Sequence, residues 1–286
     1  MTITVDELRV DFRQGSAALD AARSLFQTWG CFVATEWLDE ELQHIRAEIQ
    51  RLIALAIEQS GCRPARRSTE RFDDGFTDLE AQSPAAAAAI FGAARRLTSV
   101  HQLSVHPKLL ALSQRLMNTD LVMSSPYKPV RIDSQARESR LLPWHQDYPY
   151  AQDSLDALVY WIPLQSVDNH NGCVVVAPGS HRSGVYPLKI RRHSADGSGH
   201  RDLQLADPKM VESFPHLAVP ISDGDVLVFS SLLLHRSQVN ASPNIRWTVQ
   251  VRHGNFAHPV SVAKGWPRGH YESHWFDETH PECVSE

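Results

Sequence analysis

Leu142-Pro143-Trp144-His145-Gln146-Asp147-Tyr148 is the stretch of this 286-residue chain that indicates the fold most directly. It sets a histidine and a carboxylate two residues apart, just before an apolar run that is typical of a β-strand. Side chains two positions apart on an extended segment point the same way, so His145 and Asp147 can converge on one point. With a distant histidine they would form the two-histidine, one-carboxylate face that holds ferrous iron and leaves coordination positions open.

The spacing alone is weak, because a chain with 15 histidines contains such pairs by chance. His200-Arg201-Asp202 has the same spacing, but it lies in a polar, glycine-containing segment that predicts an inserted loop at about 189–216. Metal sites need ligands on rigid elements, so we favour His145 and Asp147.

A third ligand is expected at the end of another apolar run. Gly224-Asp225 is a turn, and the run that follows it ends at His235. The Ser-Pro-Asn turn at 242–244 then leads into a strand-like run that contains Arg246. If the two runs form a hairpin, Arg246 lies roughly 10 Å from His235 at about 3.3 Å per residue. A five-carbon diacid that chelates iron at one end could reach this arginine, whose planar guanidinium suits a carboxylate.

The alternation of side-chain direction along a strand argues against this role for Arg246. If Val249 and Val251 face the core, Arg246 should face outward together with Thr248 and Gln250. A barrel with a polar interior would remove the conflict, and we keep Arg246 as a candidate on that condition.

Composition excludes several classes of function. The net charge of −5 and the pI near 6.3 argue against a nucleic-acid or anionic-membrane partner. Four cysteines far apart, without a C-x-x-C pair, favour a reduced cytoplasmic protein over a disulfide or zinc scaffold. The chain shows no secretory signal and no apolar window long enough to span a membrane. Its pattern leaves the oligomeric state open.

Periodicity changes once along the chain. Residues 1–118 predict mainly helices, including an amphipathic one from Asp39 to Gly61 and others at 85–104 and 106–116. After them, runs rich in Val, Ile, Leu, Tyr and Trp predict strands at 121–133, 155–164, 173–178, 225–230 and 245–252. No helix of crossover length alternates with these strands, so we expect a mainly antiparallel barrel or jelly roll.

We therefore expect a single domain over 1–286. Residues 1–118 would be helical support, 119–256 the β core with the insertion at about 189–216, and 257–286 a C-terminal tail. The basic segment 62–78 and the insertion are candidate lids.

These motifs together resemble the phytanoyl-CoA dioxygenase family of iron(II)/2-oxoglutarate-dependent oxygenases. The matching pieces cover about 120–255 and occur in the family's order. They are Pro143-Trp144-His145-Gln146-Asp147, Tyr160-Trp161-Ile162-Pro163-Leu164, Asn171-Gly172-Cys173, Ala177-Pro178-Gly179-Ser180-His181, Gly224-Asp225, and His235 followed by Arg246. The resemblance implies a double-stranded β-helix, a jelly roll of the cupin type, packed against the N-terminal helices.

The resemblance also implies cofactors and site residues. The cofactors are Fe(II), 2-oxoglutarate and O2, and the iron ligands are His145, Asp147 and His235. Arg246 is the partner of the far carboxylate of 2-oxoglutarate, and Ser237, Trp161 and Lys128 match positions that line the cosubstrate pocket. Halogenating relatives have a small residue at the carboxylate position, so Asp147 argues against halogenation. Polar and aromatic side chains near the metal pair are candidates for contact with a small-molecule substrate: Arg131, Gln146, Tyr148, Tyr150 and His253.

Three functions remain open from the sequence. The first is hydroxylation of an unactivated C–H bond of a small metabolite, with release of succinate and CO2. The second uses the same cofactors but ends in desaturation, epimerisation or cyclisation. The third is a non-catalytic β-barrel that binds a metal or a ligand. The substrate itself is not indicated by any motif.

Overall fold

A seven-stranded sheet forms the centre of the computed structural model, which describes residues 3–65, 71–134, 141–192, 201–267, 269 and 275–285. The strand order is β1-β2-β10-β5-β12-β3, and β3 and β4 pair with successive parts of β12. Only β1 and β2 run parallel among these described strands, so the predicted antiparallel sheet is confirmed. The strands are β1 (Arg9–Asp11), β2 (Cys31–Thr35), β3 (Val122–Ser124), β4 (Val130–Asp133), β5 (Leu158–Pro163), β10 (Val226–Ser230) and β12 (Arg246–Asn255).

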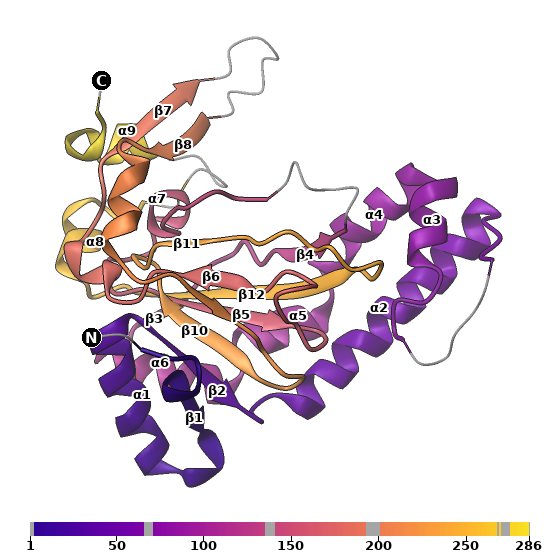
Figure 1. The fold of residues 1–286 in the computed structure, drawn as a ribbon, viewed down its shortest axis with the longest axis horizontal. Helices are drawn as coiled ribbons and strands as arrows, with labels where there is room; N and C mark the ends of the chain where they lie inside the picture. Colours follow the sequence, from indigo (N-terminus) through magenta and orange to yellow (C-terminus); the bar gives the residue numbers. More distant parts are fainter. Residues whose placement is uncertain are drawn as a thin grey trace.

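A smaller antiparallel sheet packs against one face of the large one (Figure 1). Its order is β11-β6-β9, with β6 at Val174–Val176, β9 at Leu217–Val219 and β11 at His235–Arg236. Apolar side chains of the two sheets, such as Val159 and Phe229 against Val176, fill the space between them. The result is the predicted mainly β fold of jelly-roll type, although the sheets do not close into a barrel.

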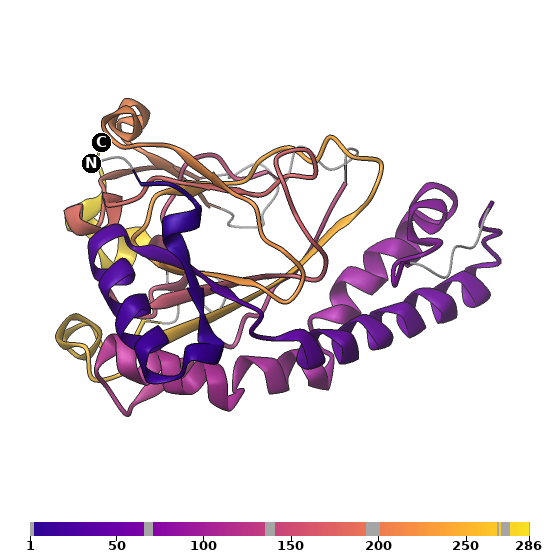
Figure 2. The same cartoon turned by 60° about the horizontal axis from the view of Figure 1, so that its bottom comes forward.

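Helices cover the other face of the large sheet, as Figure 2 shows. Their buried residues and the outward-facing apolar residues of the strands, such as Tyr160, Val228 and Trp247, form one core. The helices are α1 (Ser16–Trp29), α2 (Asp39–Ser60), α3 (Phe76–Gln82), α4 (Pro84–Ala94), α5 (Thr98–Ser104) and α6 (Pro107–Met117). The far ends of α2 and α4 project beyond the sheets together with α3 (Figure 1).

The N-terminal half differs from the expectation in its strands, which include the short strand β1, and in the division of its helices. Cys31–Thr35 is a buried strand, β2, between α1 and α2, where the surrounding pattern predicts mainly helix. The helix expected at 85–104 is divided into α4 and α5. The end of α2 agrees with the prediction, because Gly61 adopts a left-handed conformation there (φ 69°).

The insertion is more ordered than the predicted loop. It contains a hairpin of β7 (Leu188–Arg192) and β8 (Arg201–Leu205), whereas residues 193–200, with His200 of the rejected His-x-Asp pair, lie outside the described residues. The hairpin packs against two short helices, α7 (Tyr148–Ala151) and α9 (Phe276–Thr279), in an apolar cluster that includes Leu203, Tyr148 and Phe276. A third short helix, α8 (Pro259–Ala263), follows β12.

The basic segment 62–78 is partly anchored. Arg71 pairs with Asp73, whose carboxylate accepts a hydrogen bond of 2.9 Å from the indole of Trp247 on β12. Residues 66–70 lie outside the described part, and α3 begins within the segment at Phe76. Among the described helices, none combines the length and apolar character that crossing a membrane requires.

Candidate functional site

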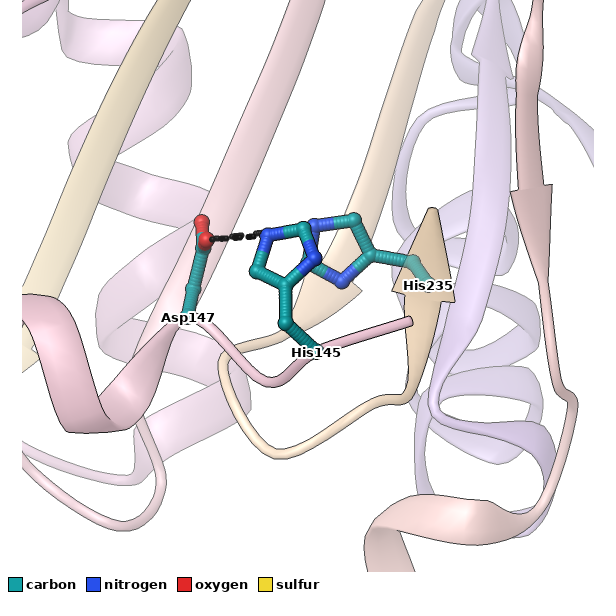
Figure 3. A group of neighbouring side chains, drawn as sticks. All are labelled: His145, Asp147 and His235. Atoms are coloured by element: carbon teal, nitrogen blue, oxygen red, sulfur yellow. Dashed lines mark ion pairs between the residues drawn. The ribbon is translucent and has the colours of Figure 1, made fainter. Parts of the chain in front are cut away.

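Backbone pairing brings the two candidate histidines side by side. His145 and His235 exchange two hydrogen bonds, N–H to O of 3.0 and 3.1 Å, which extends the small sheet beyond β11. Asp147 lies two residues further on and immediately precedes α7. The three buried side chains converge, with ligand atoms all within 4.8 Å of one another (Figure 3). The three side chains that the sequence predicts to converge therefore do lie together.

Both imidazoles are oriented by main-chain carbonyls. Nδ1 of His145 lies 2.8 Å from Pro143 O, and Nδ1 of His235 lies 3.0 Å from Leu233 O. Because a carbonyl oxygen only accepts, each Nδ1 carries a proton, and in the neutral form of each ring Nε2 is then the atom with the free lone pair. The two Nε2 atoms lie 3.5 and 3.8 Å from Oδ1 of Asp147. This donor set suits a divalent transition metal, and the hydrogen-bonded Nδ1 atoms are typical of metal-binding histidines.

Electrostatics keep Asp147 and His235 in the forms that bind a metal. Burial alone would raise the pKa of the Asp147 carboxyl, but the Arg252 guanidinium and the two imidazoles outweigh it and hold that pKa well below its usual value. Burial, reinforced by the neighbouring His145, lowers the pKa of His235 to about 3. At neutral pH the site therefore holds an ionised carboxylate opposite a neutral His235.

Arg246 occupies the same cavity as the triad. It is 3% exposed, and its Nη2 donates to Asp133 Oδ2 at 2.8 Å. Its Nε and Nη1 are buried without a hydrogen-bond partner, although buried guanidinium nitrogens are normally paired. The two orphaned donors lie on different edges of the guanidinium, and each can donate to a carboxylate oxygen that enters the cavity, so the residue fits the far end of 2-oxoglutarate.

The conflict over the direction of Arg246 has a simple origin. Both faces of β12 are buried: Trp247, Val249 and Val251 pack under the helices, whereas Arg246 and Gln250 face the space between the sheets. The interior between the sheets is thus apolar at one end and polar at the other. The expected hairpin between the two runs is wrong, because β11 pairs with β6 and belongs to the small sheet.

Ser237 and Trp161 also line the triad cavity. Trp161 projects from β5 and is 3% exposed, and Ser237 follows β11. Both positions are compatible with the expected cosubstrate pocket.

A second cavity, of about 200 Å³, adjoins the first and shares with it Leu142, Asp147 and Arg252. Rings and aliphatic groups make much of its wall: Phe91, Tyr127, Pro129, Ile132, Leu142 and Tyr150. Arg131 lines both cavities and pairs with Asp133. Arg131 and Tyr150 are therefore placed where a substrate could reach them.

Four other candidates lie elsewhere, since none of them is among the described residues that line the two cavities. Lys128 donates to Ser125 O (2.7 Å), and His253 lies between Ser113 and the carbonyl of Ser104, with contacts of 2.7 Å to each. Tyr148 contacts His280 at 2.8 Å. Gln146 is saturated by main-chain groups, because it donates to Gly184 and Leu232 and accepts from Tyr186.

Sequence reasoning missed Arg252 and Gly172. Arg252 donates to the Asp147 carboxylate, and Gly172 lies against the guanidinium of Arg246. One signal for Arg252 was available in the sequence. It lies an even number of residues after Arg246, so both side chains share the inner face of β12.

Comparisons with known proteins identify a family for this chain. The sequence model of the family described as phytanoyl-CoA dioxygenase (PhyH) matches residues 26–248. Rat peroxisomal phytanoyl-CoA dioxygenase is 25% identical over 237 residues, 76% of this chain and 62% of that protein. The 1-deoxypentalenic acid 11-beta-hydroxylase of Streptomyces exfoliatus is 30% identical over 147 residues, 49% of this chain and 50% of that protein. The matches thus span between half and two thirds of these relatives.

Solved structures share the fold. The epimerase SnoN in complex with Fe3+, alpha ketoglutarate and nogalamycin RO superposes with a TM-score of 0.55 at 18% identity, over 86% of this chain and 88% of that one. EctD from S. alaskensis with bound Fe gives a TM-score of 0.53 at 19% identity, over 82% and 76% of the two chains. From the match over residues 26–248, the chain belongs to the phytanoyl-CoA dioxygenase family, whose members depend on iron(II) and 2-oxoglutarate.

Proposed function

We propose that this chain is an iron(II)/2-oxoglutarate-dependent dioxygenase that hydroxylates an unactivated C–H bond of a small metabolite. One observation carries the proposal: a buried cavity combines two imidazole nitrogens and a carboxylate oxygen with a guanidinium that has two unpaired donors.

The roles of the residues follow from these contacts. His145, Asp147 and His235 would hold the iron, and Arg246 would bind the far carboxylate of 2-oxoglutarate, with Ser237 and Trp161 along its length. When bound, iron and 2-oxoglutarate supply the oxidation, in which O2 and 2-oxoglutarate become succinate, CO2 and one oxygen atom inserted into the substrate. The protein orients both reagents and keeps bulk water out of a site whose ligands are all buried.

The adjoining cavity would hold the substrate. Its volume of about 200 Å³ favours a compact molecule, and its ring-lined wall favours an apolar or aromatic body. Asp147 lines both cavities, so a substrate there would lie next to the metal. Arg131 and Tyr150 would contact it. Hydroxylation is the outcome we favour, because the Streptomyces exfoliatus relative, at 30% identity, is a hydroxylase by name.

Anaerobic spectroscopy tests the cofactors first. Adding 2-oxoglutarate to the iron(II) protein without oxygen should produce a weak visible charge-transfer band. Arg246→Ala should raise the 2-oxoglutarate concentration needed for the band by at least about tenfold, because the charge-assisted pair is lost. A wild-type protein that binds the metal but gives no band would indicate a non-catalytic binding protein and overturn the proposal.

Substrate-stimulated formation of succinate tests the reaction. Compact metabolites are incubated with O2 and the enzyme that holds iron(II) and 2-oxoglutarate, and the mass of each product is measured by mass spectrometry. A gain of one oxygen atom supports hydroxylation. Loss of two hydrogens, or an unchanged mass with altered stereochemistry, would instead assign desaturation or epimerisation and reject the hydroxylase.

A further inference from the structure

The two oxygens of the Asp147 carboxylate have different neighbours, and Arg252 contacts one of them. Its Nε and Nη2 lie 2.9 and 2.8 Å from Oδ2. The other oxygen, Oδ1, is the one that lies 3.5 and 3.8 Å from the Nε2 atoms of His145 and His235. One oxygen therefore faces the histidines and the other faces a guanidinium.

The guanidinium itself is held firmly. Arg252 is 8% exposed and also donates from Nη2 to Gln250 Oε1 at 2.9 Å. Both residues lie on the part of β12 that pairs with the central strand β5, where Arg252 is opposite Val159 and Gln250 is opposite Trp161. A hydrogen bond from Nε and a close ion pair from Nη2 fall on the same oxygen, and the arginine lies on a paired strand. Together they restrict rotation of the carboxylate far more than a single flexible contact would.

We propose that Arg252 is a positioning residue that confines Asp147 to a single metal-binding oxygen. The inference rests on the proposed function only in that a divalent metal occupies the triad. A carboxylate can bind a metal through one oxygen or through both. With Oδ2 held by Arg252, Asp147 takes one coordination position, and the face opposite the three ligands stays available to 2-oxoglutarate and O2.

Positioning and simple electrostatics predict opposite effects on metal affinity. A guanidinium repels a nearby cation, so a purely electrostatic Arg252 would weaken metal binding, and its removal would strengthen it. A positioning residue strengthens binding because it prepares the ligand, and loss of such contacts typically costs about tenfold to hundredfold in affinity. Replacement of Arg252 therefore separates the two roles by the direction of the change.

The test uses Arg252→Met, which keeps the length but removes charge and donors, and Arg252→Lys, which keeps a charge and can still donate to Oδ2. Arg9→Met is the matched control, since Arg9 forms a 3.0 Å pair with the buried Asp225 on another part of the sheet. Visible absorption reports Co(II) titrations of the metal-free proteins, and the anaerobic iron(II) band reports 2-oxoglutarate binding at saturating metal.

We expect Arg252→Met to bind Co(II) about tenfold to hundredfold more weakly, with an altered Co(II) spectrum. Its 2-oxoglutarate affinity at saturating metal should also fall, because a carboxylate that binds through both oxygens takes a position that the keto acid needs. Arg252→Lys should lie between Met and wild type, and Arg9→Met should match wild type. If Arg252→Met does not fold, Arg252→Lys carries the test.

Unchanged or tighter Co(II) binding in Arg252→Met would overturn the inference, as would equal weakening in Arg9→Met. Loss of turnover with unchanged metal and 2-oxoglutarate titrations would also overturn it, since Arg252 would then act on the substrate. These failures differ from a failure of the proposed function, in which the wild-type protein itself gives no 2-oxoglutarate band.

Discussion

Gly172 lies directly against the guanidinium of Arg246. A β-carbon at Gly172 would lie 2.8 Å from Arg246 Nη1 and 2.8 Å from the backbone oxygen of Gln238, and the backbone there has a φ of +89°. Gly172→Ala should therefore push the guanidinium out of place as well as strain the chain by about 1–2 kcal/mol. We expect a marked rise in the 2-oxoglutarate concentration that half-saturates the anaerobic band, while Co(II) binding stays near the wild-type value.

Gly61→Ala separates strain from contact in that experiment. Gly61 has a similar φ of +69°, but a β-carbon there would meet no atom within 4 Å. This variant should lose stability without any change in 2-oxoglutarate binding. Wild-type affinity in Gly172→Ala would show that Arg246 is not the group that contacts the cosubstrate.

Asp133 joins the two arginines of the site. It is 4% exposed and accepts from Arg131 at 3.0 Å and from Arg246 at 2.8 Å. Asp133→Asn removes the charge that compensates two guanidiniums, so we expect a loss of roughly 3 kcal/mol in the free energy of unfolding at pH 7. Urea denaturation measures it, and 2-oxoglutarate binding should weaken in parallel because Arg246 loses its anchor.

The sign of the pH dependence provides a check on this variant. Burial raises the pKa of Asp133, but Arg131 and Arg246 outweigh it, and the net pKa is lowered. The stabilisation is present above the ordinary carboxyl pKa and is lost as the pH falls through the lowered value. The loss of unfolding free energy in Asp133→Asn, relative to the wild type, should therefore be greatest at neutral pH and become smaller in strong acid. A deficit that is the same at every pH would contradict the role of the charge.

The inner face of β12 explains why part of the site escaped prediction. Alternation along 245–252 correctly predicts a strand with apolar residues on one side. A strand whose polar side faces water has the same pattern. Alternation of apolar and polar residues shows which side chains share a face, and it does not show whether the polar face is buried. Arg246 could be chosen only for its spacing from His235, and nothing local marks Arg252 as the partner of Asp147.

The pairing of strands was the other unpredictable feature. The turn at 242–244 favours a hairpin, yet the strands on its two sides belong to different sheets. A turn signal gives the change of direction, and it does not say which strand will be the neighbour; that choice is made by long-range packing, as when His235 pairs with Val176 and His145. His145 and Asp147 were predictable because their spacing is local, and His235 was predictable because it ends an apolar run that follows a turn.

Metal binding should stabilise the wild-type protein through the triad. A ligand at about 100 times its Kd adds about 2.7 kcal/mol to the free energy of unfolding, provided that it binds only the folded chain. For a chain of this size the midpoint of thermal unfolding should rise by roughly 5 °C or more. Asp147→Ala should fold but show no such rise with Co(II) or Mn(II). An equal rise in that variant would place the metal elsewhere.

His280 should make the metal-free protein sensitive to mild acid. Its imidazole lies 2.8 Å from both the Tyr148 hydroxyl and Thr279 Oγ1, which ties the C-terminal tail to α7 beside Asp147. Burial, and then the charge of Lys264, lowers its pKa from 6.5 to about 4, although the nearby Glu282 acts in the opposite direction. A base whose pKa is lowered by folding binds more protons in the unfolded chain, so stability falls as the pH drops from about 6.5 to about 4.

His280→Gln removes this proton uptake but keeps a polar side chain of similar length. The variant should be less stable than wild type at pH 7.5, since the two hydrogen bonds are imperfectly replaced. Between pH 6.5 and 4.5 its free energy of unfolding should fall less steeply than that of the wild type. The two slopes should differ by up to about 1.4 kcal/mol per pH unit. His235 contributes the same slope to both proteins, so it cancels in the comparison. Urea unfolding in the presence of a chelator measures both curves, and parallel curves would mean that His280 is already protonated in the folded protein.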